Sequence, residues 1–130
     1  MIGLDTTALI DLFKNKKEIL ELLDKVDEKI FLNEISYLEL MFGLNPENLK
    51  HKEEERFYDD LYMNFESFPL NRVSCKKAAE IFWHHQHIGK SVGKFDSMAA
   101  SIFLSNGVDK IITRNVKHFE NIKGLKVIPY

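Results

Sequence analysis

The chain has 130 residues, of which 45% are hydrophobic and 29% are charged, so it is long enough to bury the core of one compact domain. Its formal net charge of −2 excludes a strongly basic coat for nucleic acid but allows a local basic patch. No apolar run is long enough to span a bilayer and no signal-peptide pattern is present, so we expect a cytoplasmic protein without a membrane partner.

Strand and helix patterns alternate along the chain, as judged by apolar residues that recur at every second or at every third to fourth position. In the first half we expect a strand, two helices, a strand and a helix at residues 2–4, 6–13, 19–26, 30–32 and 34–43. Asn33 is the expected N-cap of the last of these helices, and Gly43 is its expected end. In the second half we expect a helix, an edge strand, two helices and two strands at residues 57–65, 68–70, 78–82, 95–105, 110–113 and 125–128.

This alternation predicts an α/β fold with a largely parallel sheet that is covered by helices on both faces. Ligands of such sheets gather beyond the carboxyl ends of the strands, near the point where the strand order reverses. Asp5 and the turn Thr113–Asn115 both follow predicted strands. We therefore expect a functional site at this edge of the sheet.

Three acidic residues interrupt otherwise apolar patterns: Asp5 at the first strand end, Glu39 within a helix, and Asp96 on the apolar face of a later helix. A buried carboxylate without a partner is costly, and one close to another carboxylate is more so. A shared divalent cation resolves this cost for all three. Mg²⁺ in particular prefers oxygen ligands and keeps waters that can give way to phosphate oxygens.

Each acid also has a purely structural interpretation. Asp5 is well placed to cap the helix that begins at Thr6, and Ser36 and Glu39 have the spacing of a capping box. The negative charge of Asp96 would interact favourably with the positive, N-terminal end of its own helix. The coincidence of all three at the expected strand ends favours a site.

Other motifs are weaker indications of function. His84 and His87 lie three residues apart, but they end an amphipathic helix, where imidazoles more often cap carbonyls or face solvent than bind metal. The single cysteine, Cys75, argues against a disulfide or a structural zinc site. A phosphohydrolase with an aspartate nucleophile needs a second aspartate two residues after Asp5, where Thr7 stands.

Four segments together carry a resemblance to a known family: Leu4–Ile10, Leu38–Leu40 followed by Gly43, Phe95–Ala100, and Ile112–Phe119. Over its full length, as a single domain of residues 1–130, the chain resembles the PIN-domain family, and specifically the toxin ribonucleases of VapBC toxin–antitoxin pairs. The resemblance implies a three-layer α/β/α sandwich with a central, mostly parallel sheet of four to five strands. It also implies an acidic pocket that binds Mg²⁺ or Mn²⁺ and cleaves RNA.

Carried over by position, the resemblance makes Asp5, Glu39 and Asp96 the catalytic, metal-binding acids, supported by three polar residues, Thr6, Thr113 and Asn115. Many relatives place a fourth acid at the position of Asn115 or of His118, so the number of metal ions stays open. Arg114, Lys117, His118 and Lys94 are candidates to contact RNA phosphates.

The expected function is therefore that of a metal-dependent endoribonuclease, the toxin of a type II toxin–antitoxin pair. The resemblance also implies a homodimer and a cognate antitoxin as partners. Two alternatives remain: a PIN ribonuclease of RNA maturation, and a PIN-like module that binds RNA or a partner without cutting.

Overall fold

A five-stranded parallel sheet forms the centre of the protein in the computed structural model, which describes residues 1–130. The strand order is β3-β2-β1-β4-β5. The strands are β1 (Ile2–Leu4), β2 (Ile30–Asn33), β3 (Glu66–Phe68), β4 (Lys110–Ile112) and β5 (Lys126–Ile128). The predicted edge position of the third strand is confirmed, but the strand ends before Pro69 instead of crossing it, because proline has no N–H to donate to a ladder.

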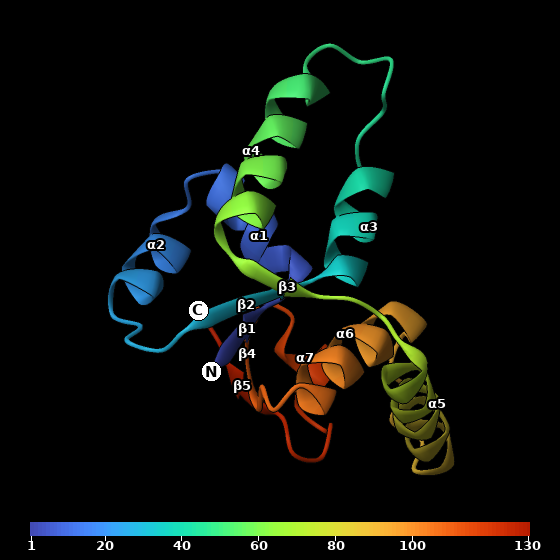
Figure 1. Cartoon of the computed structure of the whole chain (residues 1–130). Helices are drawn as coiled ribbons and strands as arrows, with labels where there is room; N and C mark the ends of the chain where they lie inside the picture. The colour runs from blue at the N-terminus through green and yellow to red at the C-terminus, as the bar shows by residue number, and fades with distance from the viewer.

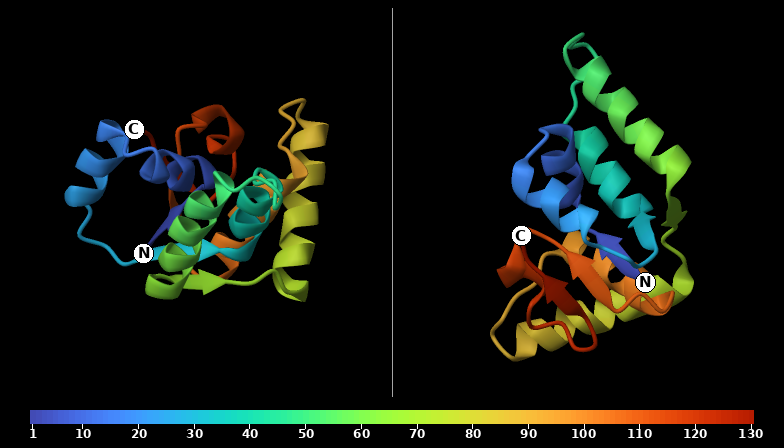
Figure 2. Two further views of the ribbon diagram at one scale, coloured as in Figure 1. Left: turned by 90° about the horizontal axis from the view of Figure 1, so that it is seen from above. Right: turned by 90° about the vertical axis from the view of Figure 1, so that its left-hand side faces the viewer.

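Seven helices cover the two faces of the sheet (Figures 1 and 2). The helices are α1 (Thr6–Phe13), α2 (Lys17–Asp24), α3 (Glu34–Phe42), α4 (His51–Asn64), α5 (Arg72–His87), α6 (Lys94–Ser105) and α7 (Val116–Phe119). In Figure 1, α1, α3 and α4 lie above the sheet and α5, α6 and α7 below it, which confirms the predicted three-layer sandwich. None of these helices has the length and apolar character needed to cross a membrane.

Two hydrophobic cores fill the space on either side of the sheet, because successive side chains of a strand point to opposite faces. Leu32 packs in the core between the sheet and helices α1 to α4, whereas its neighbour Phe31 packs in the core between the sheet and helices α6 and α7. In β1, Gly3 faces the second core, where an added Cβ would lie 2.5 Å from the ring of Phe103. A glycine at this position thus lets α6 pack directly on the sheet.

The helix boundaries correct several expectations. The helix α5 spans Arg72–His87 and not only residues 78–82. The helix α4 begins at His51 and not at Phe57, so the charged segment of residues 51–56 is helical as well. This segment is rich in lysine, glutamate and arginine, which are good helix formers. The four-residue helix α7 was not anticipated, since it is too short to show a helical period.

The strand order determines where on the sheet the candidate site lies. From β1 the chain moves outward through β2 to β3, and it then returns to the other side of β1 to form β4 and β5. The order therefore reverses between β1 and β4, which are neighbours. Asp5 and Thr113 follow the carboxyl ends of these two strands, at the position where open α/β sheets bind ligands.

Candidate active site

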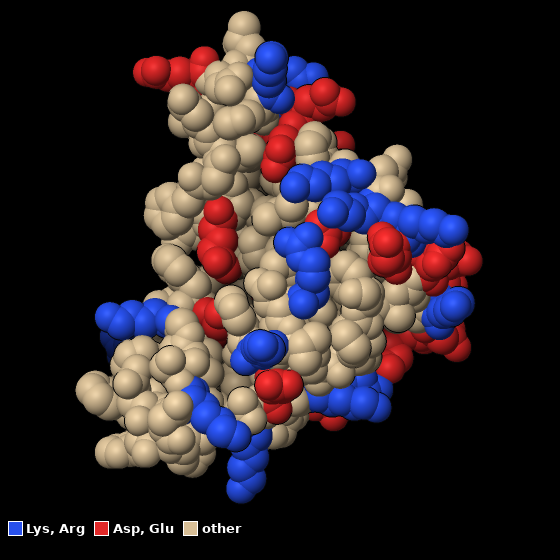
Figure 3. Space-filling view, turned by 180° about the vertical axis from the view of Figure 1, so that it is seen from behind, with Lys and Arg blue, Asp and Glu red and all other residues tan.

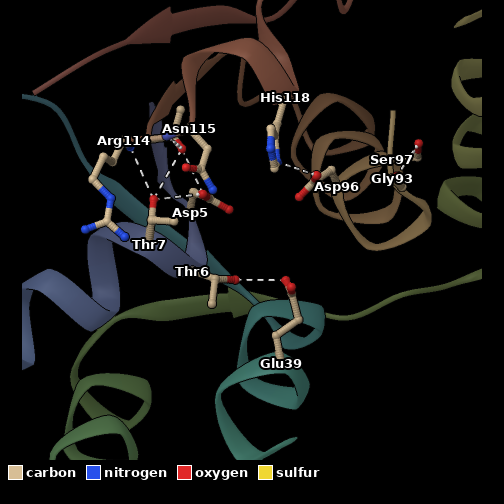
Figure 4. Close-up of polar contacts among 11 residues, drawn as sticks. Asp5, Thr6, Thr7, Glu39, Gly93, Asp96, Ser97, Arg114, Asn115 and His118 are labelled. Atoms are coloured by element: carbon tan, nitrogen blue, oxygen red, sulfur yellow. Dashed lines mark hydrogen bonds and ion pairs between the residues drawn. The ribbon is translucent and has the colours of Figure 1, made fainter. Parts of the chain in front are cut away.

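A pocket of about 380 Å³ opens at this edge of the sheet, and all three acids predicted from the sequence line it. Asp5 comes from the end of β1, Glu39 from the middle of α3, and Asp96 from the first turn of α6 (Figure 4). The remaining lining residues are Thr6, Thr7, Ile10, Gly93, Lys94, Phe95, Asn115 and His118. Segments that are far apart in the sequence thus supply one acidic pocket.

Asp5 is the most deeply buried of the three acids, with only 3% of its surface exposed. Its Oδ2 accepts hydrogen bonds from the hydroxyl of Thr7 at 3.0 Å and from that of Thr113 at 2.8 Å. Asp5 occupies the N-cap position of α1, but its side chain makes no capping bond, so the capping interpretation of this carboxylate is wrong. Asp5 is a buried carboxylate whose hydrogen-bond donors are neutral hydroxyls.

Glu39 lies across the pocket on α3. Its Oε1 accepts a hydrogen bond from the hydroxyl of Thr6 at 2.9 Å. Burial raises the pKa of Glu39 above its ordinary value of 4.5; the Thr6 bond opposes this rise, and the negative charges of Asp5 and Asp96 add to it. The capping box is excluded, because Asn33 caps α3 by accepting from the Ser36 N–H at 2.9 Å and Glu39 lies well inside the helix.

Asp96 forms the third side of the pocket. Burial and the charge of Asp5 raise its pKa above the ordinary value of 3.8, while His118 acts in the opposite direction. Nδ1 of His118, on α7, lies 2.9 Å from Oδ2 of Asp96. The histidine that we expected to contact phosphate therefore joins α7 to α6 at the rim of the pocket.

A hydrogen-bond network joins the turn after β4 to Asp5 (Figure 4). Thr113 is fully buried and accepts a hydrogen bond from the backbone N–H of Asn115 at 3.0 Å. The backbone N–H of Arg114 donates to the hydroxyl of Thr7 at 3.2 Å, and Thr7 in turn donates to Asp5. In the sequence, Thr7 was noted only because an aspartate is absent at its position. Its place two residues after Asp5 is the signal that would have identified its hydroxyl as a donor to this carboxylate.

The expected phosphate contacts divide into two groups. Lys94 and His118 line the acidic pocket, whereas Arg114 and Lys117 do not. Nη1 of Arg114 pairs instead with Oδ1 of the buried Asp11 at 3.1 Å. The hydroxyl of Tyr130 donates to the other oxygen of Asp11 at 2.7 Å. The guanidinium of Arg114 is therefore engaged away from the pocket.

The histidines near the end of α5 lie apart from the pocket. His84 and His87 are exposed, and His85 is buried with its ring nitrogens 2.7 Å from the Ile81 carbonyl and 3.1 Å from the Asn121 carbonyl. Cys75 is exposed in the first turn of α5. Across the chain, no three His, Cys, Asp or Glu side chains converge closely enough to hold a metal ion as they stand.

Each acid of the pocket nevertheless keeps a second oxygen that has no hydrogen bond within the protein. The bonds described above engage Oδ2 of Asp5, Oε1 of Glu39 and Oδ2 of Asp96. Oδ1 of Asp5, Oε2 of Glu39 and Oδ1 of Asp96 are left for a ligand. An all-oxygen donor set of this kind suits a hard divalent cation such as Mg²⁺ or Mn²⁺.

Comparisons with known proteins agree with this architecture. VapBC-1 from nontypeable Haemophilus influenzae is similar with a TM-score of 0.81 and 26% identity, over 99% of this chain and 98% of that one. VapBC2 from Rickettsia felis, solved with a DNA fragment from its promoter, gives 0.82 and 22%, over 100% and 99%. VapC20 from Mycobacterium tuberculosis, described as a toxin that cleaves the sarcin-ricin loop, gives 0.71 and 12%, over 97% and 99%.

A search of curated protein sequences finds no significant match. The sequence model of the PIN domain, in contrast, matches residues 2–125, which include every strand except β5 and every residue that lines the acidic pocket. The match extends over nearly the whole chain, and the chain therefore belongs to the PIN domain family.

Proposed function

We propose that this protein, as a single PIN domain, is a metal-dependent endoribonuclease that hydrolyses RNA phosphodiester bonds, and that it is the toxin of a type II toxin–antitoxin pair. The observation that carries the proposal is that Asp5, Glu39 and Asp96 line one pocket, each with a free oxygen. Membership of the PIN family and the similarity to VapBC complexes support it.

The residues present fit a divalent cation by their chemistry. Burial raises the pKa values of Glu39 and Asp96, and the charge of Asp5 adds to both rises, so a cation in the pocket would relieve the charge of these acids. Asp5, Asp96 and Glu39 would hold Mg²⁺ or Mn²⁺ through the free oxygens. The bound cation would polarise the scissile phosphate and lower the pKa of an attacking water.

The surrounding residues hold these acids in place for the reaction. The hydroxyls of Thr7 and Thr113 fix the orientation of Asp5, because both donate to the same oxygen and leave Oδ1 directed elsewhere. Thr6 holds Glu39 in the same way, so that Oε2 is available to orient a water. Lys94, which also lines the pocket, is a candidate to contact a substrate phosphate.

The proposed partners follow from the same comparisons. Several similar structures are VapBC complexes, which supports a cognate antitoxin as a binding partner of this chain. A homodimer is a further part of the proposal. Light scattering of the purified protein, alone and mixed with its antitoxin, tests both interactions. A monomer under all conditions would contradict the proposed homodimer.

The decisive experiment is cleavage of a mixed pool of structured RNAs with Mg²⁺ or Mn²⁺, with EDTA as the control. We expect discrete products from the wild-type protein and none from Asp5→Asn or Asp96→Asn. Circular dichroism establishes that the variants are folded. Products that persist in EDTA, or that Asp5→Asn still forms at the wild-type rate, would contradict the proposal.

A further inference from the structure

Two helices of the protein begin with the same sequence pattern, Asn-x-x-Ser, and use its serine differently. At the start of α5, Oγ of Ser74 accepts a hydrogen bond from the backbone N–H of Asn71 at 2.9 Å and so completes a capping box. At the start of α3, Asn33 caps the helix by accepting from the backbone N–H of Ser36 at 2.9 Å. Oγ of Ser36, however, lies 3.0 Å from Oγ1 of Thr6, which lines the acidic pocket. The serine hydroxyl of α3 is thus directed at the pocket instead of at its own helix cap.

Asn33 and Ser36 are both 0% exposed, and a buried polar group without a hydrogen bond is costly. The helix cap needs only the side-chain oxygen of Asn33 and the backbone N–H of Ser36, so it does not explain a buried hydroxyl at this serine. Figure 3 shows one face of the molecular surface, where acidic and basic side chains are interspersed. Neither Asn33 nor Ser36 contributes to the surface, so neither can touch a substrate. Any role that they have in the pocket is indirect.

The donors and acceptors fix the direction of each hydrogen bond between these residues and Glu39. A backbone N–H only donates, so the atom of Asn33 that faces the N–H of Ser36 is oxygen, and Nδ2 donates to Oγ of Ser36 at 3.1 Å. Thr6 has two possible acceptors, Oγ of Ser36 at 3.0 Å and Oε1 of Glu39 at 2.9 Å, but its hydroxyl has one hydrogen. Because a carboxylate only accepts, this hydrogen belongs on Glu39. The contact between Ser36 and Thr6 then uses the hydrogen of Ser36, which the bond from Asn33 leaves free.

We propose that Asn33 and Ser36 are positioning residues of the acidic pocket. Through this chain of hydrogen bonds, which we call the Asn33 relay, they keep the hydroxyl hydrogen of Thr6 on Glu39. Oε1 of Glu39 is thereby always occupied, and Oε2 is the oxygen left for a cation. The inference rests on the proposed metal-dependent function and extends it to two residues that no substrate can reach.

Asn33→Asp reverses the relay without removing the helix cap, because aspartate caps helices about as well as asparagine. A carboxylate oxygen would replace the nitrogen that now donates to Ser36, so Ser36 would have to donate to it. The contact with Thr6 would then take the hydrogen of Thr6, and Glu39 would lose its donor. We expect Mn²⁺ to bind this variant roughly 10- to 100-fold more weakly than the wild type. The added negative charge alone would act in the opposite direction, since it attracts the cation.

The double variant tests whether Asn33 acts through Ser36. Ser36→Ala alone should weaken Mn²⁺ binding by a smaller factor, roughly 2- to 10-fold, because Thr6 keeps Glu39 as an acceptor but loses the donor that fixes its hydroxyl. On this background, Asn33→Asp should cause no further loss. An equal loss from Asn33→Asp with and without the serine would show that the change acts through charge or through the cap, and it would overturn the inference.

The start of α5 provides matched controls. Asn71→Asp and Ser74→Ala make the same changes in a cap that is closed on itself, and neither residue lines the acidic pocket. Both should bind Mn²⁺ as the wild type does, even if their stability falls. Binding is measured from the electron paramagnetic resonance signal of free Mn²⁺ with the protein alone, and urea unfolding establishes that each variant is folded. Wild-type affinity in Ser36→Ala would overturn the inference even if Asn33→Asp did not fold.

Crystal structures in EDTA at neutral pH test the relay without a metal. In the wild type, Oγ1 of Thr6 and Oε1 of Glu39 should lie at hydrogen-bonding distance, as they do here. In Asn33→Asp they should move apart, because two oxygens without a hydrogen between them repel each other. An unchanged contact would overturn the inference. Failure of the proposed function appears separately, as wild-type protein that binds no Mn²⁺ although the two crystal structures differ as expected.

Discussion

Two buried aspartates at the ends of one short helix have very different surroundings. Asp11, near the end of α1, is 1% exposed and is neutralised by Arg114, with Tyr130 donating to its second oxygen. Asp5, just before α1, is 3% exposed and receives only the hydroxyls of Thr7 and Thr113. Asp11 thus has a cationic side chain as its partner, whereas the hydrogen-bond donors of Asp5 are neutral. This difference supports the proposal that Asp5 binds an external cation.

The largest expected effect is the loss of activity in Asp5→Asn. Removing this proposed metal ligand should lower metal-dependent RNA cleavage by about a thousand-fold, the order of the transition-state stabilisation that a bound metal supplies. The free energy of unfolding in EDTA, measured with urea, should stay the same or rise, because an uncompensated buried charge is removed. A large loss of stability instead would make Asp5 a structural residue like Asp11.

The matched change at the other aspartate, Asp11→Asn, should lower stability and leave cleavage nearly unchanged. Asp11→Asn breaks the ion pair with Arg114 and weakens the bond from Tyr130, so the free energy of unfolding should fall by about 1–3 kcal/mol. Cleavage per folded molecule should stay within a few-fold of the wild type. If the variant keeps full stability but loses cleavage, the division between the two aspartates does not hold.

Metal binding tests the difference between Asp5 and Asp11 without a substrate. At a Mg²⁺ or Mn²⁺ concentration ten times its Kd, the wild-type protein should gain about 1.4 kcal/mol in stability, because the ion binds only the folded state. Asp11→Asn should show the same gain and Asp5→Asn none, as measured by thermal or urea unfolding with and without the ion. An equal gain in Asp5→Asn would place the ion elsewhere on the protein.

The smallest expected effect is a dependence of stability on pH. Glu39 and Asp96 have raised pKa values, so the folded protein binds their protons more tightly than the unfolded chain does. In EDTA, stability should therefore be greatest at low pH with respect to these two groups, and it should decline as pH rises from their ordinary values of 4.5 and 3.8 through the raised ones.

Glu39→Gln tests this dependence, because it removes one of the two titrating groups and should make the decline shallower. The measurement is a series of urea unfolding curves across the acidic range, with the wild type in parallel. A slope that is unchanged in Glu39→Gln would show that the burial of this carboxylate costs nothing.

Sequence reasoning succeeded where structure depends on nearby residues. The strands, the Asn33 cap and the end of α3 at Gly43 are local features that a single sequence displays. The position of Asp5 followed from the rule that parallel strands end together, and those of Glu39 and Asp96 at the same pocket followed from the resemblance. These three acids were identified because each disagrees with the pattern around it.

What the sequence did not display is pairing between distant side chains. Arg114 and Asp11 are 103 residues apart, and His118 and Asp96 are 22 apart, so no spacing rule connects them. Arg114 was expected to contact phosphate because it is basic and follows a strand. Only the fold shows that the buried Asp11 already engages it.

The position of β4 has a consequence for the time at which the protein acquires activity. This strand pairs with β1, although it is the fourth strand to be synthesised. A chain still emerging from the ribosome and ending before residue 110 has an open edge on β1, and its Asp5 lacks the hydroxyl of Thr113. Any cutting activity should thus arise only after nearly the whole chain has been made. If the protein is a toxin as proposed, prematurely released fragments are expected to be harmless to the cell that produces them.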